Sequence, residues 1–443
     1  MRVAVTNRDI IKLAAPISLA ILVPQISFLT NTAFLGRFGE RELGVNGVSG
    51  IFYLIISMIG YGLSSGMQVQ MARRAGEDDD RGLARVFING IMLSGMFALG
   101  LMMLSLWATP IIFGLSLHDS DNIELTINFL YLRVWGLPFL MLSQIANSFF
   151  ISIHQTRYLI YGSVAGAIVN IFFDYALIFG HFGFPEWGLA GAAVASIIGE
   201  FTACATMYGI FYFKRLYERY PIQQYARFDF KLSRRTLKVA SPLIIQFLFS
   251  IGGWQVFFIF VEHLGRQQLA ASQILRSIFG IVGVVTWAFA ATCNTIVSNV
   301  IGQGKQSRVI GTIIKVAKLS LGFTAVLCLL LLVFAHPFLR LYSTDEALVN
   351  FAVPSLRIIV LATLIMSIST VAFNGVVGTG NTLVNLFVEI ACVCTYLTYC
   401  YLVIERGHSS LQWAWVSEFV YWSSLFIASF IYLRSGRWKG KVI

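Results

Sequence analysis

The fold is decided by Lys12-Leu-Ala-Ala-Pro16, because a similar stretch returns later in the chain as Lys238-Val-Ala-Ser-Pro242. The match continues at a constant offset of 226 as far as Gly76 and its counterpart Gly302. Landmarks that recur in the same order at one spacing indicate an internal repeat. We therefore predict a chain made of two similar halves.

The composition is that of a protein that crosses a membrane many times. Of the 443 residues, 57% are hydrophobic and only 12% are charged, whereas soluble domains carry about 25% charged residues. The apolar stretches predict an all-α polytopic membrane protein with about twelve transmembrane helices of roughly 20 or more residues each. The predicted spans are 9–36, 44–72, 84–110, 123–153, 158–180, 187–213, 236–262, 269–301, 309–339, 347–377, 382–404 and 410–433.

An even number of spans in each half means that both halves start on the same side of the membrane. The halves then form two pseudo-symmetric six-helix bundles, a parallel repeat whose axis lies along the membrane normal. The predicted division is an N-lobe at 1–213, a basic cytoplasmic linker at 214–237 and a C-lobe at 238–443. Secondary transporters built in this way bind substrate between their halves and work by alternating access.

The net charge of +11 arises from 32 Lys and Arg residues against 21 Asp and Glu residues. Most of the basic residues fall in alternate loops, with the densest group at 214–238. This distribution follows the positive-inside rule and predicts a multi-pass protein of the plasma (inner) membrane with both termini in the cytoplasm. The expected partners are the lipid bilayer and a small-molecule substrate, not nucleic acid, and we expect a monomer.

Polar residues at membrane depth predict an ion-coupling site in the first half. Asn170 and Asp174 lie four residues apart in an apolar segment, so they share one face of a helix. A carboxyl in lipid is costly unless it faces a cavity or a partner. Asn31 lies deep in the first span, and Ser196 lies one turn before Glu200 in the sixth. We expect these five residues to form the site.

The residue types leave the coupling ion open between H⁺ and Na⁺. A lone buried carboxyl suits proton binding, whereas carboxylate and amide oxygens together suit Na⁺. A Na⁺ site would use Asp174, Asn170 and Asn31. The structural alternatives are that Asp174 only bonds Asn170, and that Glu200 has a scaffold role shared with its counterpart Glu418.

Other residues are candidates for substrate binding and for a hinge. Gln144 and Asn147 share a face of the fourth span, and Arg276 lies early in the eighth. The alternative for the two amides is to bond neighbouring helices. Pro16 and Pro24 interrupt the first span and predict either a bend that changes during transport or a static kink.

No pattern for enzyme chemistry is present in the sequence. The six histidines include no pair at i,i+4 and no HExxH motif. Gly302-Gln-Gly-Lys305 lacks the upstream glycine of a phosphate-binding loop. We therefore expect no enzyme and no cofactor, with H⁺ or Na⁺ as the coupling ion.

The motifs, taken in order, resemble those of the multidrug and toxic compound extrusion (MATE) family over essentially the whole chain. They are Pro16, Asn31-Thr-Ala-Phe-Leu-Gly-Arg-Phe-Gly39, Gly76, Asn170-x-x-x-Asp174, Gly191-Ala-Ala-Val-Ala-Ser196, and the repeat around Pro242 and Gly265. The resemblance implies secondary active multidrug efflux, in which a cation is exchanged for amphipathic, cationic compounds. The Asn-x-x-x-Asp pair looks like the DNA-damage-inducible protein F branch.

One position departs from that branch. Asn31 stands where the branch has an Asp in the first span, so a relay of two carboxylates between the first and fifth spans is not available. Either Asp174 carries the coupling alone, or Glu200 supplies the second carboxyl, or coupling is weak or altered. The second half has Cys394 and Thr398 at the places of the ion pair, so we expect a one-sided ion site.

Two alternative functions rank lower. A flippase for a lipid-linked molecule would need basic residues in the spans to meet phosphates, and only Arg133, Arg276 and Arg357 qualify. Of these, Arg133 and Arg357 are expected to extend towards the headgroups. An intramembrane enzyme would need His, Ser or metal-ligand spacing that the sequence lacks.

Overall fold

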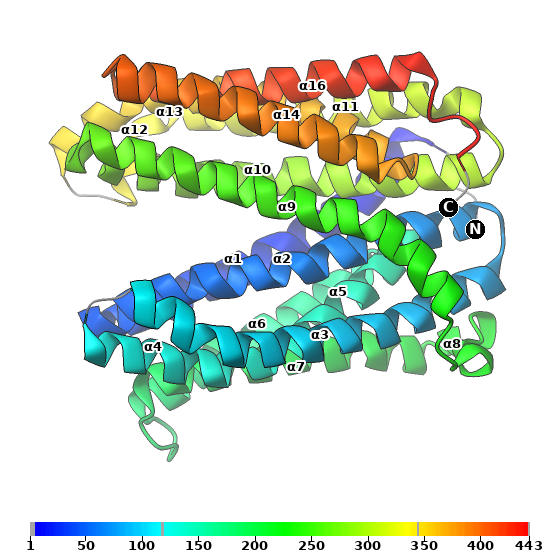
Figure 1. Ribbon diagram of the computed structural model, residues 1–443, viewed down its shortest axis with the longest axis horizontal. Helices are drawn as coiled ribbons and strands as arrows, with labels where there is room; N and C mark the ends of the chain where they lie inside the picture. The colour runs from blue at the N-terminus through cyan, green and yellow to red at the C-terminus, as the bar shows by residue number, and fades with distance from the viewer. Residues whose placement is uncertain (1–4, 117–118, 343–344, 442–443) are drawn as a thin grey trace. The chain divides into compact units, whose positions relative to one another are not determined.

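The computed structural model describes residues 5–116, 119–342 and 345–441, and its regular elements over these ranges are all helices (Figure 1). Twelve helices in the described ranges are long and apolar enough to cross a membrane, judged by length and composition. Each overlaps one predicted span, from Asn7–Phe38 to Leu411–Ser435. The all-α polytopic class and the number of spans are confirmed.

Several spans are built from more than one helix. The first half contains α1 (Asn7–Phe38), α2 (Glu40–Gly76), α3 (Asp80–Ser116), α4 (Ser120–Arg133), the 3-10 turn η1 (Val134–Gly136), α5 (Leu137–Ser152), α6 (Arg157–Phe179) and α7 (Gly188–Phe213). α8 (Leu216–Arg219) and η2 (Ile222–Tyr225) follow. The second half contains α9 (Phe230–Leu264), α10 (Arg266–Gly302), η3 (Gln306–Arg308), α11 (Val309–Val333), α12 (Ala335–Arg340), α13 (Glu346–Gly378), α14 (Thr382–Cys400), η4 (Tyr401–Arg406), α15 (Leu411–Trp415) and α16 (Ser417–Ser435).

The chain packs as two compact units whose limits differ from a simple cut in the middle. The first unit comprises Leu19–Ala75 and Asp79–Ile244, and the second comprises Met1–Ser18, Gly76–Asp78 and Ile245–Ile443. α1 passes from one unit to the other after Ser18, and α9 does so after Ile244. These two points are equivalent in the repeat, so each half contributes the start of its first helix to the unit formed mainly by the other half.

The exchanged helix starts are well packed where they lie. In the second unit, Ile10, Leu13 and Ala14 of α1 join a buried cluster with Phe289 and Ile296 of α10. These apolar side chains are removed from water and lipid alike, so the start of α1 is part of that unit's core.

In the first unit, the start of α9 approaches α2 at two glycines. A Cβ on Gly62 would lie 2.7 Å from Ile244 Cα, and a Cβ on Gly66 would lie 2.8 Å from Ala240 Cα. Both distances are shorter than a side chain allows, so glycine is what lets the two backbones approach.

The basic linker is anchored to the first unit. Tyr220 is buried with its ring 5.3 Å from that of Phe149 on α5, and burial raises the pKa of Tyr220 to about 12. Arg219 lies 2.9 Å from a carboxylate oxygen of Asp80 at the start of α3. The linker therefore packs as part of the helix bundle.

Candidate functional site

Two pairs of polar side chains join α1 to α6 in the first unit. Ser27 Oγ donates a hydrogen bond to Asn170 Oδ1, and one turn further Asn31 Nδ2 donates to Asp174 Oδ1 over 3.0 Å. The partners on each helix are four residues apart and so lie on one face. We call Ser27, Asn31, Asn170 and Asp174 the first ladder. Sequence reasoning missed Ser27, although it lies four residues before Asn31.

The first ladder is buried and its hydrogen bonding is incomplete. Asp174 is 0% exposed, Asn31 8% and Asn170 9%. Among the residues that the structure describes, Asp174 Oδ2 and Asn170 Nδ2 have no hydrogen-bond partner. A buried polar atom without a partner costs about 1–3 kcal/mol. Asp174 Oδ2 therefore marks where a proton, a cation or a water would bind with most gain, and Asn170 Nδ2 where an acceptor such as a water would.

α6 packs closely against α7 on one side, while the ladder side chains of α6 bond α1. Figure 1 shows the helices of this half. A Cβ on Gly199 of α7 would lie 2.8 Å from Asn170 Cβ, and one on Gly166 of α6 would lie 2.9 Å from Gly199 O. A Cβ on Gly191 would lie 2.5 Å from Leu177 O. Small residues let the two helices pack closely along their length, so α7 leaves no free space next to Asn170.

The two predicted site residues on α7 lie outside the ladder. Ser196 is half-buried, and no hydrogen bond joins it to Asn170 or Asp174 among the described residues. Glu200 accepts from Arg133 Nη1 at 2.9 Å and Nη2 at 2.6 Å. The structure therefore does not bring all five predicted residues together.

Arg133 is held inside the first unit, so the expectation that it extends to the headgroups is wrong. Its guanidinium binds Glu200 through two nitrogens and lies 3.8 Å from the centre of the Tyr53 ring. The Tyr53 hydroxyl also lies 3.1 Å from Glu200 Oε2. A paired, hydrogen-bonded charge is the form in which an arginine is tolerated away from water.

The predicted substrate contacts lie in two different units. In the first unit, Gln144 Nε2 donates to Ser57 O over 3.3 Å, and Asn147 is half-buried. In the second unit, the Arg276 guanidinium lies 5.1 Å from the ring centre of Trp254 and 5.2 Å from that of Phe258.

The predicted hinge lies in a continuous helix. α1 runs from Asn7 to Phe38 through both Pro16 and Pro24. The point at which α1 passes between units, after Ser18, falls between the two prolines. A backbone hydrogen bond is missing at each proline, so this is the part of α1 with the weakest internal support.

A second ladder joins α9 to α14 in the second unit, and sequence reasoning missed it. Asn385 Nδ2 donates to Gln246 Oε1 over 2.8 Å, and Ser250 Oγ donates to Glu389 Oε1. Tyr421 on α16 donates to the same oxygen over 2.7 Å. We call Gln246, Ser250, Asn385 and Glu389 the second ladder. The signal that could have found it is the Asn-x-x-x-Glu spacing, which resembles the Asn-x-x-x-Asp of α6.

The positions expected to match the ion pair do not form part of this ladder. Cys394 and Thr398 are exposed, and the Thr398 hydroxyl bonds only the Cys394 carbonyl of its own helix. The second unit also buries a carboxyl, that of Glu389, at another position of α14. The constant offset of 226 would lead from Asn170 and Asp174 to Tyr396 and Cys400, so the register of the first two helices is not kept in the fifth span of the repeat.

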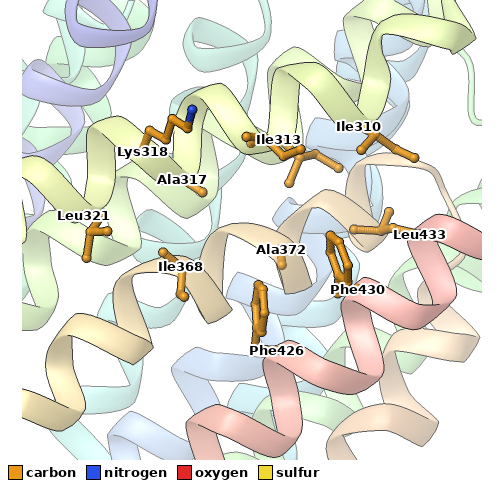
Figure 2. Close-up of a pocket in the computed structure, with 11 residues that line it drawn as sticks. Ile310, Ile313, Ala317, Lys318, Leu321, Ile368, Ala372, Phe426, Phe430 and Leu433 are labelled. Atoms are coloured by element: carbon orange, nitrogen blue, oxygen red, sulfur yellow. The ribbon is translucent and has the colours of Figure 1, made fainter.

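An apolar groove of about 180 Å³ runs between α11, α13 and α16 (Figure 2). It is lined by aliphatic side chains and by Phe426 and Phe430, with Lys318 as the one charged residue in its lining. None of the predicted site residues lies in it. The groove lacks the convergent polar groups that mark a specific binding site.

Two segments of the chain match one known family model. Residues 16–176 and 242–402 each match the MatE model. The chain is 23% identical over 447 residues to Probable multidrug resistance protein NorM of Thermotoga maritima, covering 99% of this chain and 94% of that one. It is 26% identical over 346 residues to the protein of the same name from Photorhabdus laumondii, covering 76% and 74%.

The fold is also that of a solved transporter. The chain superposes with a TM-score of 0.89, at 16% identity, on the outward-facing conformation of a multidrug resistance MATE family transporter of the MOP superfamily. The superposition covers 98% of this chain and 96% of the other. At this identity the likeness concerns the fold, and it extends over both halves.

Proposed function

Because the chain belongs to the MatE family, we propose that it is a secondary active efflux transporter. It exchanges a cation for amphipathic, cationic compounds by alternating access and needs no cofactor besides the coupling ion. The relatives named as multidrug resistance proteins support export of more than one compound. The family match covers both halves and speaks for a transporter rather than an enzyme.

The observation that carries the proposal is the buried Asp174 carboxylate, which bonds Asn31 through one oxygen and has no partner for the other in the described residues. An ion that binds Oδ2 changes the charge of the Asp174 carboxylate, which accepts the hydrogen bond from Asn31. Asn31 and Ser27 lie on α1 just beyond Pro24. Ion binding therefore changes the strength of the hydrogen bond between α1 and α6 and favours one bend of α1 over another. The ion then binds the two conformations of α1 with different affinity, as coupling requires.

We propose H⁺ rather than Na⁺ as the coupling ion. The two open atoms of the first ladder are the carboxylate oxygen of Asp174 and the amide nitrogen of Asn170. An N–H donor does not coordinate a cation, whereas a proton needs only the carboxylate oxygen.

In this proposal the chain keeps its resemblance to the DNA-damage-inducible protein F branch, because the residue at position 31 contacts Asp174, as expected for the place of the first-span acid. In this chain Asn31 replaces the first-span acid and lies at hydrogen-bond distance from the fifth-span carboxylate. It acts as a neutral donor, so Asp174 alone carries the charge of the first ladder. Glu200 is occupied by Arg133 and in this proposal serves to hold α4 and α7 together.

The remaining assignments follow from the same proposal. Gln144 Oε1 has no hydrogen-bond partner among the described residues, and with Asn147 it forms a polar contact for substrate. The distribution of basic residues over alternate loops supports a location in the plasma (inner) membrane with both termini in the cytoplasm. In this proposal the chain acts as a monomer, since each ladder is built from residues of a single unit of the chain.

The test is ethidium efflux from liposomes that contain the purified protein, with a proton or a Na⁺ gradient imposed separately. Asp174→Asn removes the titratable group at nearly constant volume and should abolish efflux in either gradient. Asp121→Asn, the same substitution at an acid whose side chain is 75% exposed, should leave efflux unchanged. Full efflux by Asp174→Asn would refute the proposal, and efflux driven only by Na⁺ would replace the proton.

One observation favours a second function, the flipping of a lipid-linked molecule. Arg276 contacts two aromatic rings, and no carboxylate lies within salt-bridge distance of it in the described part of the chain. A guanidinium of this kind could meet a phosphate. A changed lipid profile after gene deletion, without greater dye sensitivity, would favour the flippase, and Arg276→Gln should then reproduce it.

A further inference from the structure

The second unit holds a buried carboxyl, Glu389, to which the proposed function assigns no role. Its side chain is 0% exposed. Ser250 and Tyr421 both donate to Oε1, and Oε2 has no hydrogen-bond partner among the residues described. An ionised carboxylate would leave a charged oxygen without a partner inside a helix bundle, whereas a carboxylic acid places a neutral hydroxyl there.

No positively charged side chain of the described residues acts on Glu389. The titratable groups that act on it are Tyr421 on α16 and Cys392 on α14. α9 presents the Ser250 hydroxyl, and α13 contributes no titratable group to this site in the described ranges. With no cation to pair with, the group is neutral when protonated and expensive when ionised. This is the property of a site that exchanges a proton and not of a structural ion pair.

The second ladder repeats the design of the first with different residues. In each unit the first and fifth spans of one half are joined by two pairs of polar side chains four residues apart, and the pair further along ends on a carboxyl. At the constant offset of the repeat, Ser250 matches Pro24, two turns before Asn31. In the frame of the repeat, the second carboxyl site therefore lies about 10 Å earlier along its helix than the first.

At the positions of α9 that correspond to the first ladder, α9 and α14 pack closely through apolar groups. Gly253 is the counterpart of Ser27 in the repeat. A Cβ on Gly253 would lie 2.8 Å from Val393 Cγ1 on α14. The polar pairs of the second unit thus lie at a different position along the helices, but they connect the same two spans of the repeat.

We propose that Glu389 is a second proton-binding carboxyl, so that each unit carries one. This inference rests on the proposed function, because a proton that binds and leaves in each cycle implies proton-coupled antiport. Loss of the proton strengthens the hydrogen bonds from Ser250 and Tyr421, since bonds to a charged oxygen are roughly twice as strong. Deprotonation thereby draws α9, α14 and α16 together, and protonation loosens them.

The test is infrared difference spectroscopy of the full-length protein in liposomes, taken between alkaline and acid pH. The wild type should show protonated-carboxyl bands from both ladders. Glu389→Gln, which keeps an oxygen to accept from Ser250 and Tyr421, should lose one band and keep that of Asp174. Asp174→Asn should lose the other, and the double variant should lose both. A Glu389→Gln spectrum identical to that of the wild type would overturn the inference.

Two further variants keep the test decisive. Tyr421→Phe removes a donor but not the carboxyl, so the Glu389 band should persist at a shifted frequency; an unshifted band would also count against the assignment. Glu418→Gln alters another buried carboxyl of the same unit, which Trp422 and Tyr396 bond, and should leave the Glu389 band in place. Because no transport is measured, failure of antiport in vesicles and failure of Glu389 to titrate are separate results.

Discussion

Asn31 Nδ2 lies 3.0 Å from Asp174 Oδ1, across the contact between α1 and α6. A neutral amide thus occupies the place from which a second carboxylate would act on Asp174. The amide satisfies one oxygen and adds no charge, and the proposed function assigns the coupling ion of the first ladder to the other oxygen. The consequences can be tested by changing either the charge or the hydrogen bond at position 31.

Asn31→Leu should lower the initial rate of efflux at least tenfold. It removes the donor to Asp174 Oδ1, and an unpaired buried acceptor costs about 1–3 kcal/mol. Asn31→Asp should keep efflux but make its rate depend more steeply on pH, because two carboxyls at this distance must share a proton. The measurement is ethidium efflux from liposomes over a series of pH values. Equal pH profiles for Asn31→Asp and the wild type would contradict the assigned geometry.

Gly199→Ala should impair efflux and stability together. The added Cβ would lie 2.8 Å from Asn170 Cβ and 3.0 Å from Gly166 O, and such overpacking costs roughly 1–3 kcal/mol. Gly209→Ala is the matched control on the same helix, because its Cβ would meet only Phe213 at 3.9 Å. Thermal unfolding in detergent and dye efflux measure the two effects. Equal behaviour of the two variants would show that α7 does not support the ladder.

Glu200→Gln should reduce stability without changing the coupling ion. The Arg133 and Glu200 side chains are 14% and 16% exposed, and removing one partner of such a pair costs about 3–5 kcal/mol. The double variant Arg133→Gln/Glu200→Gln should recover part of the loss, since no charge is left unpaired. Thermal unfolding of all three proteins gives the comparison. Normal stability with lost ion dependence would instead assign Glu200 to coupling.

The linker should loosen at acid pH through Asp229. The Leu232 N–H donates to Asp229 Oδ1 at 3.0 Å and, with Arg85 at 3.2 Å, holds the pKa of this carboxyl below its usual value. A lowered pKa stabilises the anchored linker above the unfolded value of about 3.9, and this stabilisation is lost as pH falls below it. Hydrogen exchange of the linker, corrected for intrinsic rates, should therefore rise below about pH 4. Asp229→Asn should show no such transition.

The sequence predicts what depends on local spacing. The Asn170 and Asp174 side chains share a face because they are four residues apart, and the structure finds them bonded to α1 through that face. The apolar spans follow from composition in the same way. Asn31 was also found, because it interrupts an apolar helix.

What the sequence does not predict depends on contacts between distant residues. Arg133 and Glu200 are 67 residues apart, and nothing near either one in sequence identifies its partner. The sequence repeat does not identify the second ladder, because its register drifts: Cys394 stands at the expected place of Asn170, whereas the buried amide is Asn385. Helix pairing, rather than sequence register, decides which polar residues of a repeat meet.

The exchange of helix starts between the two units has a consequence for how this chain can be divided. A half-length chain cut in the linker would leave Gly62 and Gly66 without the α9 segment that covers them, and would leave Phe289 without Ile10 and Leu13. Two copies of one half could close such gaps only by trading helix ends, as domain-swapped dimers do. Each half of the repeat therefore contributes a helix start that the packing of the other half requires, so neither half is expected to fold completely alone.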